Sequence, residues 1–365
     1  MNGALLGTWV SRIPAIQQRL GLSEAELGIV LLGMSLGVLT GLSLAGGWVA
    51  RFGSRPVTVT GFGVMCLVLP ILPLALNALL LGMLLFLFGG AMSVMDVAMN
   101  EQAVFVERQA KKPLMSRFHG AFSIGGLLGA LLGAAFAGAQ MAPLLHFLAA
   151  AVLFGIGMWM AAPQLLPQTE VHAKSGPVFR VPDRALWSLG AVALISSVGE
   201  GAMADWSAVY VAKVLESSGG TAALAFAAYS AAMTVARLSG DHLKAHFSLA
   251  AIVRTGGWIA VAGLVLVVFS NHIALTLIGF AVIGLGLANI IPIAFTAAGN
   301  YPGIPSGTGI AAVASIGYAG FLAGPPVIGL LAEGTSLRVA FASIIVLLVF
   351  LPLIAQAVSA SQPLD

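Results

Sequence analysis

Ionisable and amide side chains interrupt the long apolar runs of this chain, and two pairs of them lie close together in the sequence. Asp96 and Asn100 lie near the end of one run, and His119 and Ser123 open the next. The members of each pair are four residues apart, so they share one face of a helix. Polar groups inside a membrane are costly and usually mark a pathway or a site. These residues are therefore candidates for proton transfer and substrate binding.

Asp96 has the chemistry of a proton-coupling group. An ionised carboxylate at membrane depth costs about 2.5–3.5 kcal/mol on insertion scales, so such a group exchanges a proton when its exposure to water changes. Asn100 would orient Asp96 or bind the substrate, and His119 would shuttle a proton or contact the substrate. A structural role stays open for both ionisable groups: a polar clamp between helices for Asp96 and a hydrogen-bonded packing residue for His119.

A second polar cluster lies at 196–206 in another apolar run. Glu200 falls midway along this run and is a second candidate proton carrier, whereas Asp205 and Trp206 lie nearer the outer end as candidate substrate ligands. Side chains five residues apart in a helix point about 140° away from each other, since each residue advances ~100°. The two carboxylates are therefore not expected to form a tight pair. The alternative is internal ion pairing, with Arg12 as a candidate partner.

Three further residues are candidate substrate ligands because of where they lie in the apolar runs. Trp9 and Arg12 lie near the end of the first run, and Asn289 precedes Pro292. A proline bends a helix, so Asn289 would face a cavity at the bend. Arg12 would snorkel to the lipid headgroups, pair with Asp205 or bind an anionic substrate, and these alternatives stay open.

The composition is that of a membrane protein. Of the 365 residues, 59% are hydrophobic and 8% are charged, whereas a soluble domain carries about 25% charged residues. The mean hydropathy is +1.03, and the apolar runs lack alternation, which indicates helices. The basic residues are scattered over short loops, so no nucleic-acid partner is expected.

Several kinds of chemistry have no signal in the sequence. Cys66 is the single cysteine, which excludes an internal disulfide and a cysteine-based metal site. No Walker loop with its lysine and no His-Glu-x-x-His motif occurs, and these motifs would mark an ATP-driven pump or a metalloprotease. We therefore expect no enzymatic activity, no metal and no cofactor.

The apolar runs predict twelve membrane-spanning helices, since about 20 residues are needed to cross a bilayer. The first run, 1–16, is half a span, so either helix 1 is short or it is truncated; of these we expect truncation, with residues missing before Met1. The full runs are 26–50, 56–76, 78–106, 113–139, 142–162, 185–212, 220–239, 249–270, 272–298, 306–332 and 336–358. A polar segment divides them into a six-helix bundle at 1–163, a cytoplasmic linker at 164–184 and a second six-helix bundle at 185–365.

The lysine and arginine residues of the loops predict the orientation. With the N-terminus cytoplasmic, 12 of the 16 fall on the inner side. The four outer ones are Arg12, Arg19, Lys213 and Arg338. This bias predicts a multi-pass protein of the bacterial inner membrane with both termini cytoplasmic.

The two halves match each other at an offset near 193 residues. Gly46 matches Gly240 at 194, and Ser123-Ile124-Gly125 matches Ser315-Ile316-Gly317 at 192. A six-plus-six duplication of this kind encloses the substrate site of many transporters near the midplane, and one half rocks against the other.

The turn after the second span, at 46–55, resembles the signature loop of the major facilitator superfamily. Four residues match its pattern: Gly46, Arg51, Gly53 and Arg55. The resemblance implies a transporter fold of two pseudo-symmetric bundles and a cytoplasmic gate held closed by charge pairs. The acidic position of the loop is Ala50 here, so Arg237 and Asp241 of the second half are candidates for that latch. The alternative is a plain basic turn.

Three stretches resemble the fucose-permease-like branch of the same superfamily, namely Asp96-Val97-Ala98-Met99-Asn100, 118–123 and 286–292. The resemblance implies that Asp96 carries the coupled proton. The branch's partner carboxylate in the first helix falls on Val10 here, next to Trp9. A fucose-type site is therefore not inherited intact.

We interpret the chain as a secondary active transporter that moves a small polar solute, a sugar or related metabolite, by alternating access and with coupling to protons. A drug or metabolite exporter on the same fold is the alternative, and a non-transporting membrane sensor is the third hypothesis. A cavity lined by methionine and aromatic side chains would indicate export, whereas amides and an indole would indicate sugar import. The expected partners are the solute, protons and the lipid bilayer, with the chain acting as a monomer.

Overall fold

The computed structural model describes residues 1–111, 115–167 and 186–361, and these are almost wholly α-helical. The helices are α1 (Asn2–Val10), α2 (Ile13–Leu20), α3 (Glu24–Phe52), α4 (Ser54–Val68), α5 (Ala78–Ala110), α6 (Met115–Gly138), α7 (Pro143–Ala161), α8 (Trp187–Val214), α9 (Gly219–Leu238), α10 (Gly240–His246), α11 (Leu249–Phe269), α12 (Ile273–Leu287), α13 (Ile290–Gly299), α14 (Ser306–Gly334) and α15 (Leu337–Leu353).

The described residues contain ten segments that are long and apolar enough to cross a membrane, with α12 and α13 joined as one of them. α15 is a shorter apolar helix, and α1 and α2 follow each other as the two parts of a first span. With these additions the prediction of twelve spans is confirmed. Large apolar side chains such as Trp159 and Leu67 are 78% and 71% exposed, as expected for a surface that faces lipid.

The first span is broken rather than continuous. α1 ends at Val10, the chain turns at Ser11 and Arg12, and α2 begins at Ile13. Pro14 lies in the first turn of α2, where a missing backbone N–H removes no helical hydrogen bond. Nearly every residue of α1 is buried, so this short helix is held by its packing against α6.

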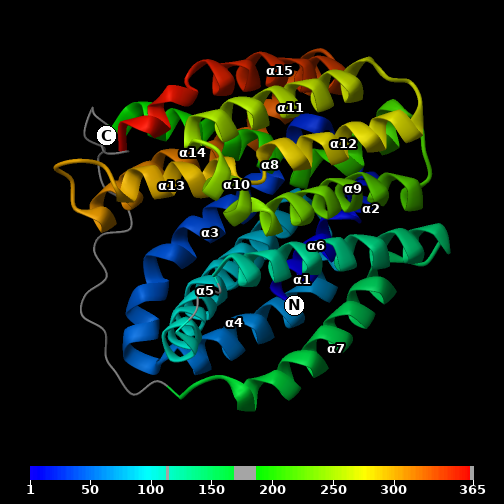
Figure 1. Cartoon of the computed structure of the whole chain (residues 1–365). Helices are drawn as coiled ribbons and strands as arrows, with labels where there is room; N and C mark the ends of the chain where they lie inside the picture. Colours follow the sequence, from blue (N-terminus) through cyan, green and yellow to red (C-terminus); the bar gives the residue numbers. More distant parts are fainter. Residues whose placement is uncertain (112–114, 168–185, 362–365) are drawn as a thin grey trace.

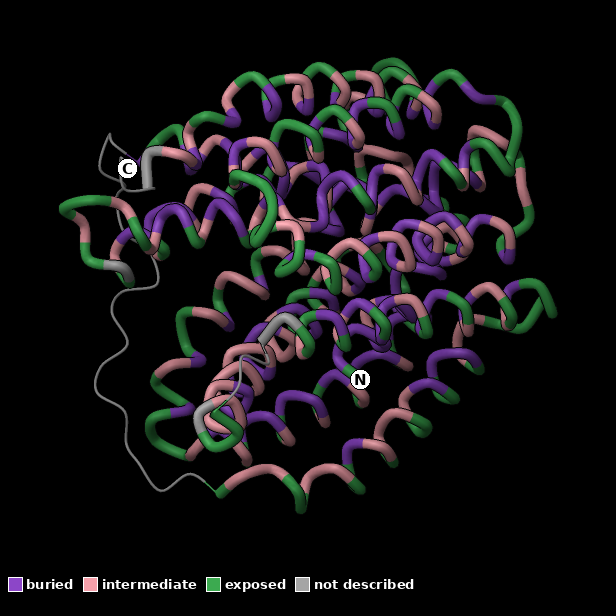
Figure 2. The backbone as a smooth tube through the Cα atoms, viewed as in Figure 1, coloured by how far each residue is buried: buried purple, intermediate pink, exposed green. Residues whose placement is uncertain are grey.

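The helices form two bundles, α1 to α7 and α8 to α15 (Figure 1). The bundles meet along two helix pairs, α3 with α14 and α6 with α9. Buried residues lie where helices face one another, and exposed residues line the outer turns (Figure 2). Residues 168–184 of the predicted linker lie outside the described residues.

The two bundles are tied together at one end around the N-terminus of α3. Lys213 of α8 pairs with Glu24 at 2.5 Å, and Glu333 of α14 accepts the backbone N–H of Glu24 at 3.1 Å. Free N–H groups and the helix dipole favour a carboxylate at this position. A Cβ on Gly28 or Gly329 would crowd the backbone of the opposite helix, α14 or α3, so the helices approach closely here. We call this end the Glu24 end.

We expect Glu333→Gln to loosen the Glu24 end. The variant keeps the shape of the side chain but removes a charge that is worth about 0.3–1 kcal/mol at a helix N-terminus. The fraction of molecules open at this end should rise by up to about fivefold. Spin labels on Gln18 and Ser218, which are exposed near this end, should then show longer distances in a Cys66→Ser background.

Glu26→Gln is the matched control for this prediction. Glu26 accepts the backbone N–H of Ser23 within the capping box of α3, so its bond lies inside the first bundle. An unchanged distance distribution in Glu333→Gln, or an equal change in Glu26→Gln, would contradict a cross-bundle role for Glu333.

Candidate functional site

A cavity of about 310 Å³ lies between the two bundles, near the middle of the spans. Its wall comes from α1, α3, α5 and α6 of the first bundle and from α8, α9 and α14 of the second. Transporters built from two repeats hold their substrate in this position. The cavity is therefore the candidate substrate site.

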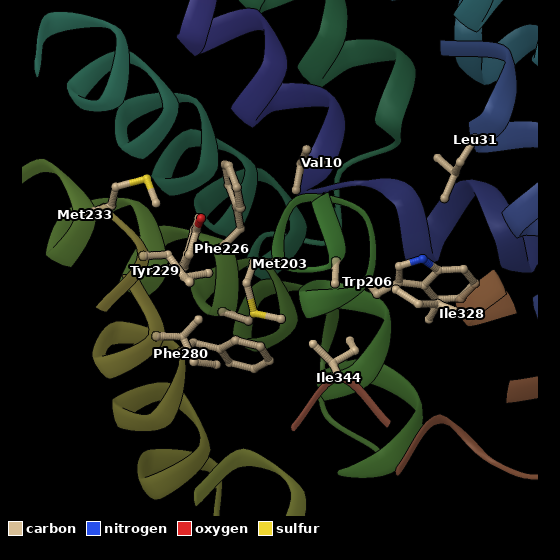
Figure 3. Packing of buried hydrophobic residues seen from close by; sticks show 14 of the residues in the cluster. Val10, Leu31, Met203, Trp206, Phe226, Tyr229, Met233, Phe280, Ile328 and Ile344 are labelled. Carbon is tan, nitrogen blue, oxygen red and sulfur yellow. The ribbon is translucent and has the colours of Figure 1, made fainter. Parts of the chain in front are cut away.

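α9 presents one continuous face to this cavity. Phe226, Tyr229, Met233 and Arg237 follow at spacings of three and four residues, and Ser230 lies four residues after Phe226, which places all five in one stripe along the helix. The first two rings lie 5.9 Å apart between their centroids, and Figure 3 shows them on the same helix as Met233. The stripe combines aromatic surface with a cation.

Arg237 connects the second bundle to the first across the cavity. Its Nη2 lies 3.2 Å from Oε2 of Glu200 on α8, and its Nη1 donates to Oγ of Ser123 on α6 at 3.2 Å. Its Nε donates to the Ala288 carbonyl oxygen at 3.4 Å. The structure therefore places this gate candidate in the cavity wall, beside the proton-carrier candidate Glu200.

Asp205 lines the same cavity as Glu200. Within the described residues it has no hydrogen bond or ion pair, and Oε1 of Glu200 also has no hydrogen-bond partner. The candidate partner Arg12 lies elsewhere: it is 4% exposed and its Nη2 donates to the Met141 carbonyl oxygen. The structure thus does not pair Arg12 with Asp205.

The two tryptophans that were candidate substrate ligands do not line this cavity. Trp206 is 0% exposed and belongs to the apolar cluster that includes Ile328 (Figure 3). Trp9 is equally enclosed, with its ring centroid 6.5 Å from that of Phe147. The indole N–H groups of both residues lack a hydrogen-bond partner among the described residues. The structure therefore places both rings in packed cores.

Asp96 and Asn100 lie beyond the cavity on the helix face that lines it. Met92 belongs to the cavity wall, and Asp96 and Asn100 follow it at four-residue spacing, so the three share a face. Asn100 Nδ2 donates to Asp96 Oδ2 at 3.2 Å. Tyr318, which lines the cavity from α14, lies within electrostatic range of Asp96. Asp96 is thus near the cavity without forming its wall.

His119 and Asn289 have different surroundings from those expected of substrate ligands. His119 is exposed on α6 and lies within electrostatic range of Arg237. Asn289 precedes α13 at the break in the tenth span, and its Nδ2 donates to the Ala236 carbonyl oxygen at 3.0 Å. The predicted bend is present, but Asn289 joins it to the end of α9 and does not reach the central cavity.

The remaining gate candidates lie at the ends of α3 and α10. Gly53 has φ +86° and allows the turn between α3 and α4, since only glycine adopts this conformation without strain. The Arg51 guanidinium lies over the Phe52 ring at 5.1 Å. Asp241 pairs with Lys244 of its own helix at 2.8 Å. Gly46 lies in the last turns of α3, and half-buried Arg55 lies in the first turn of α4. The cytoplasmic latch that these residues would form remains a prediction.

A hydrolase-like spacing occurs in α3 without hydrolase geometry. Gly33-Met34-Ser35-Leu36-Gly37 has the Gly-x-Ser-x-Gly pattern of a nucleophile elbow, which requires a strand-to-helix turn. Here it lies inside a continuous helix, and Ser35 Oγ donates to the Phe321 carbonyl oxygen at 3.0 Å. Ser35 therefore ties α3 to α14 beside the cavity.

The aromatic residues of the wall were not predicted from the sequence. Phe122, Phe226, Tyr229, Tyr318 and Phe321 all line the cavity, yet none was a candidate. The three- and four-residue spacing between Phe226 and Arg237 was the available signal, because a stripe that ends on a charge differs from a lipid-facing stripe. Tyr318 and Phe321 are also three residues apart on α14, but no charged residue follows them on that face, and Phe122 lies alone in the part of the wall that α6 forms.

The fold is similar to those of solved transporters. A bacterial homologue of the human lysosomal transporter Spinster, inward-facing and occupied, has a TM-score of 0.77 at 15% identity, covering 99% of this chain and 94% of that one. The nucleoside transporter NupG (D323A mutant) has a TM-score of 0.77 at 12% identity, covering 99% of this chain and 97% of that one. FucP, in the outward conformation, has 0.63 at 15% identity, with 97% of each chain covered. These likenesses show the fold, and the fucose-permease-like branch remains a prediction.

Sequence comparison identifies the family directly. The chain is 35% identical over 357 residues to an uncharacterized MFS-type transporter of Yersinia pestis, covering 98% of this chain and 93% of that protein. It is 36% identical over 345 residues to the uncharacterized transporter y4wD of Sinorhizobium fredii, with 93% and 91% covered. The model of the Major Facilitator Superfamily matches residues 3–318. The chain is therefore a multi-pass membrane protein that belongs to the major facilitator superfamily of transporters.

Proposed function

We propose that the chain exports an amphiphilic solute, a metabolite or drug-like molecule, through the central cavity. The observation that carries this proposal is the lining of the cavity. Its described wall contains three methionines and five aromatic residues, and no amide or indole side chain. This is the lining expected of an exporter rather than of a sugar importer. Unbranched methionines re-pack around ligands of different shape, which suits a solute with an apolar body.

Coupling to protons would use the carboxylates at the cavity. Glu200 is paired with Arg237, Asp205 faces the cavity, and Asp96 lies one helical turn beyond Met92. A carboxylate whose contact with water changes during alternating access exchanges a proton in each cycle. Asp96, Glu200 and Asp205 are therefore the proposed proton carriers.

The direction of access follows from the ties between the bundles. The excess of lysine and arginine in the loops predicts that the Glu24 end lies on the outer side of a bacterial inner membrane, with both termini cytoplasmic. The Lys213–Glu24 pair and the Glu333 cap hold the bundles together at that end. We infer a monomer whose cavity is closed to the outside, the arrangement in which an exporter loads its solute.

The test is transport in proteoliposomes that contain a pH-sensitive dye and carry an imposed pH gradient. The panel holds sugars, nucleosides, organic acids and aromatic amines. Amphiphilic members should collapse the gradient in wild type but not in Glu200→Gln or in empty liposomes. Gradient collapse by sugars alone would replace export with sugar import, and no response to any member would contradict proton-coupled transport.

A further inference from the structure

The charges in the central cavity do not balance within the protein. Its wall contains two carboxylates, Glu200 and Asp205, and one guanidinium, Arg237, among the described residues. Arg237 is already bonded to Glu200, Ser123 and the Ala288 carbonyl oxygen. The Glu200–Arg237 pair is neutral as a unit, so an ionised Asp205 would leave the cavity with one negative charge.

Asp205 lacks the partners that a carboxylate in this position requires. It is half-buried within the membrane-spanning helix α8, and the described residues give it no hydrogen bond or ion pair. Burying an unpaired charge is strongly unfavourable, whereas a counter-ion at hydrogen-bonding distance offsets much of the penalty. An unpaired carboxylate that faces a cavity between two bundles therefore indicates a partner supplied from outside the chain.

The rest of the wall fits a cation attached to an apolar body. Phe226 and Tyr229 form a ring pair on α9, and Phe122, Tyr318 and Phe321 approach from α6 and α14. Ammonium groups are attracted to aromatic faces by about 0.5–2 kcal/mol, more strongly where water is excluded. A Cβ added to Gly201 would come within 3.1 Å of the Phe321 ring, so this ring packs directly against the backbone of α8 in the cavity wall. The volume of about 310 Å³ lies at the small end of ligand pockets, which span roughly 300–1,000 Å³.

From these observations we propose that the central cavity is a site for an organic monocation, a substituted ammonium on an aromatic or alkyl body, and that Asp205 is its counter-ion. This inference rests on the proposed function, because it names the class of solute that the same cavity holds. Glu200 does not take this role, because Arg237 already satisfies its charge. Asp205 is thus the residue that sets the preference for a positively charged solute.

The test compares two ligands of equal shape that differ in charge. Benzyltrimethylammonium is the cationic probe, and neopentylbenzene is the same molecule with carbon in place of the charged nitrogen. Binding to the purified full chain is measured by titration calorimetry in detergent. Wild type should bind the cation at least tenfold more tightly than the isostere. Asp205→Asn should lose at least tenfold in affinity for the cation while its affinity for the isostere stays the same, and Asp205→Glu should retain cation binding.

Two controls separate a loss of the binding site from a general loss of charge or of the fold. Glu26→Gln changes an exposed carboxylate outside the cavity and should bind both probes like wild type. The melting temperature of each unliganded variant shows whether the fold is retained, and Asp205→Glu tests the site without removing the charge. Equal affinity of wild type for the two probes, or an Asp205→Asn variant that still prefers the cation, would overturn the proposal.

The transport proposal and the cation site fail in different ways. A wild type that prefers the cation but moves no member of the solute panel contradicts transport and leaves the site standing. A wild type that moves amphiphilic solutes but does not distinguish the two probes contradicts the cation site and leaves transport standing.

Discussion

Arg237→Ala is expected to abolish transport and to lower the free energy of unfolding by about 3 kcal/mol, the lower end of the range for breaking a buried ion pair. The side chains of Arg237 and Glu200 are only 20% and 13% exposed. Removing the guanidinium leaves the Glu200 carboxylate in a membrane-spanning helix without a counter-ion. It also removes the bond to Ser123, which links the second bundle to the first.

The double variant Arg237→Met, Glu200→Gln separates stability from transport. Neutral side chains of similar size remove the unpaired charge, so most of the lost stability should return. Transport should stay absent, because the link to Ser123 and the charged pair are both missing. The measurements are the melting temperature in detergent and gradient collapse in proteoliposomes.

Arg254→Ala is the matched control for these variants. Arg254 is exposed on α11, outside the cavity wall, so its loss should change neither quantity. Full transport by Arg237→Ala would show that the bond between Arg237 and Ser123 is not needed for transport. A double variant that is as unstable as the single one would show that the unpaired Glu200 charge is not the cause of the lost stability.

The spans were predictable because length and hydropathy alone determine whether a helix crosses a bilayer. The predicted run 249–270 agrees closely with α11 (Leu249–Phe269). The break of the first span at Ser11 and Arg12 was not predictable in the same way. It depends on packing between α1 and α6, which no local pattern of residue types contains.

The position of Arg237 shows why the site was harder to predict than the fold. In the sequence it lies at the end of an apolar run beside Asp241, which is typical of a residue in a cytoplasmic turn. In the structure its long side chain reaches Glu200, 37 residues away in the chain. Such a pairing is set by how two helices pack. Residue type identified Glu200 and Asp205, because a carboxylate inside an apolar run is unusual wherever its helix lies.

Trp9 and Trp206 illustrate the opposite error. An indole is both a stacking surface for ligands and a large apolar side chain for a core, and the sequence alone does not separate these roles. Both rings are buried and neither belongs to the described cavity wall, whereas phenylalanine and tyrosine rings do form that wall. Ring type did not decide which aromatic residues face the cavity; the helix face on which each one lies did.

A substitution in the close contact between α1 and α6 is the second change for which we expect a large effect on stability and transport. A Cβ added to Gly129 would overlap the carbonyl oxygen of Ala4 and come within 2.8 Å of the backbone nitrogen of Thr8. Gly7 is equally close to the backbone of Gly126. Small residues allow this approach between membrane helices. Because backbone faces backbone, no flexible side chain can move aside to admit a larger residue.

Gly129→Leu is therefore expected to displace α1 and to abolish both folding and transport, whereas Gly129→Ala should give a smaller loss, of the order of 1–3 kcal/mol for an overpacked site. Displacement of α1 would also move Gly3 and Leu6, which are its contribution to the cavity wall. The yield of monodisperse protein in size-exclusion chromatography and the melting temperature measure the effect. Gly155→Leu on α7 is the control, since a Cβ there meets no atom within 4 Å. If Gly129→Leu gave the yield of Gly155→Leu, the short helix α1 would be held by something other than its glycine contacts with α6, and its place in the cavity wall would need another explanation.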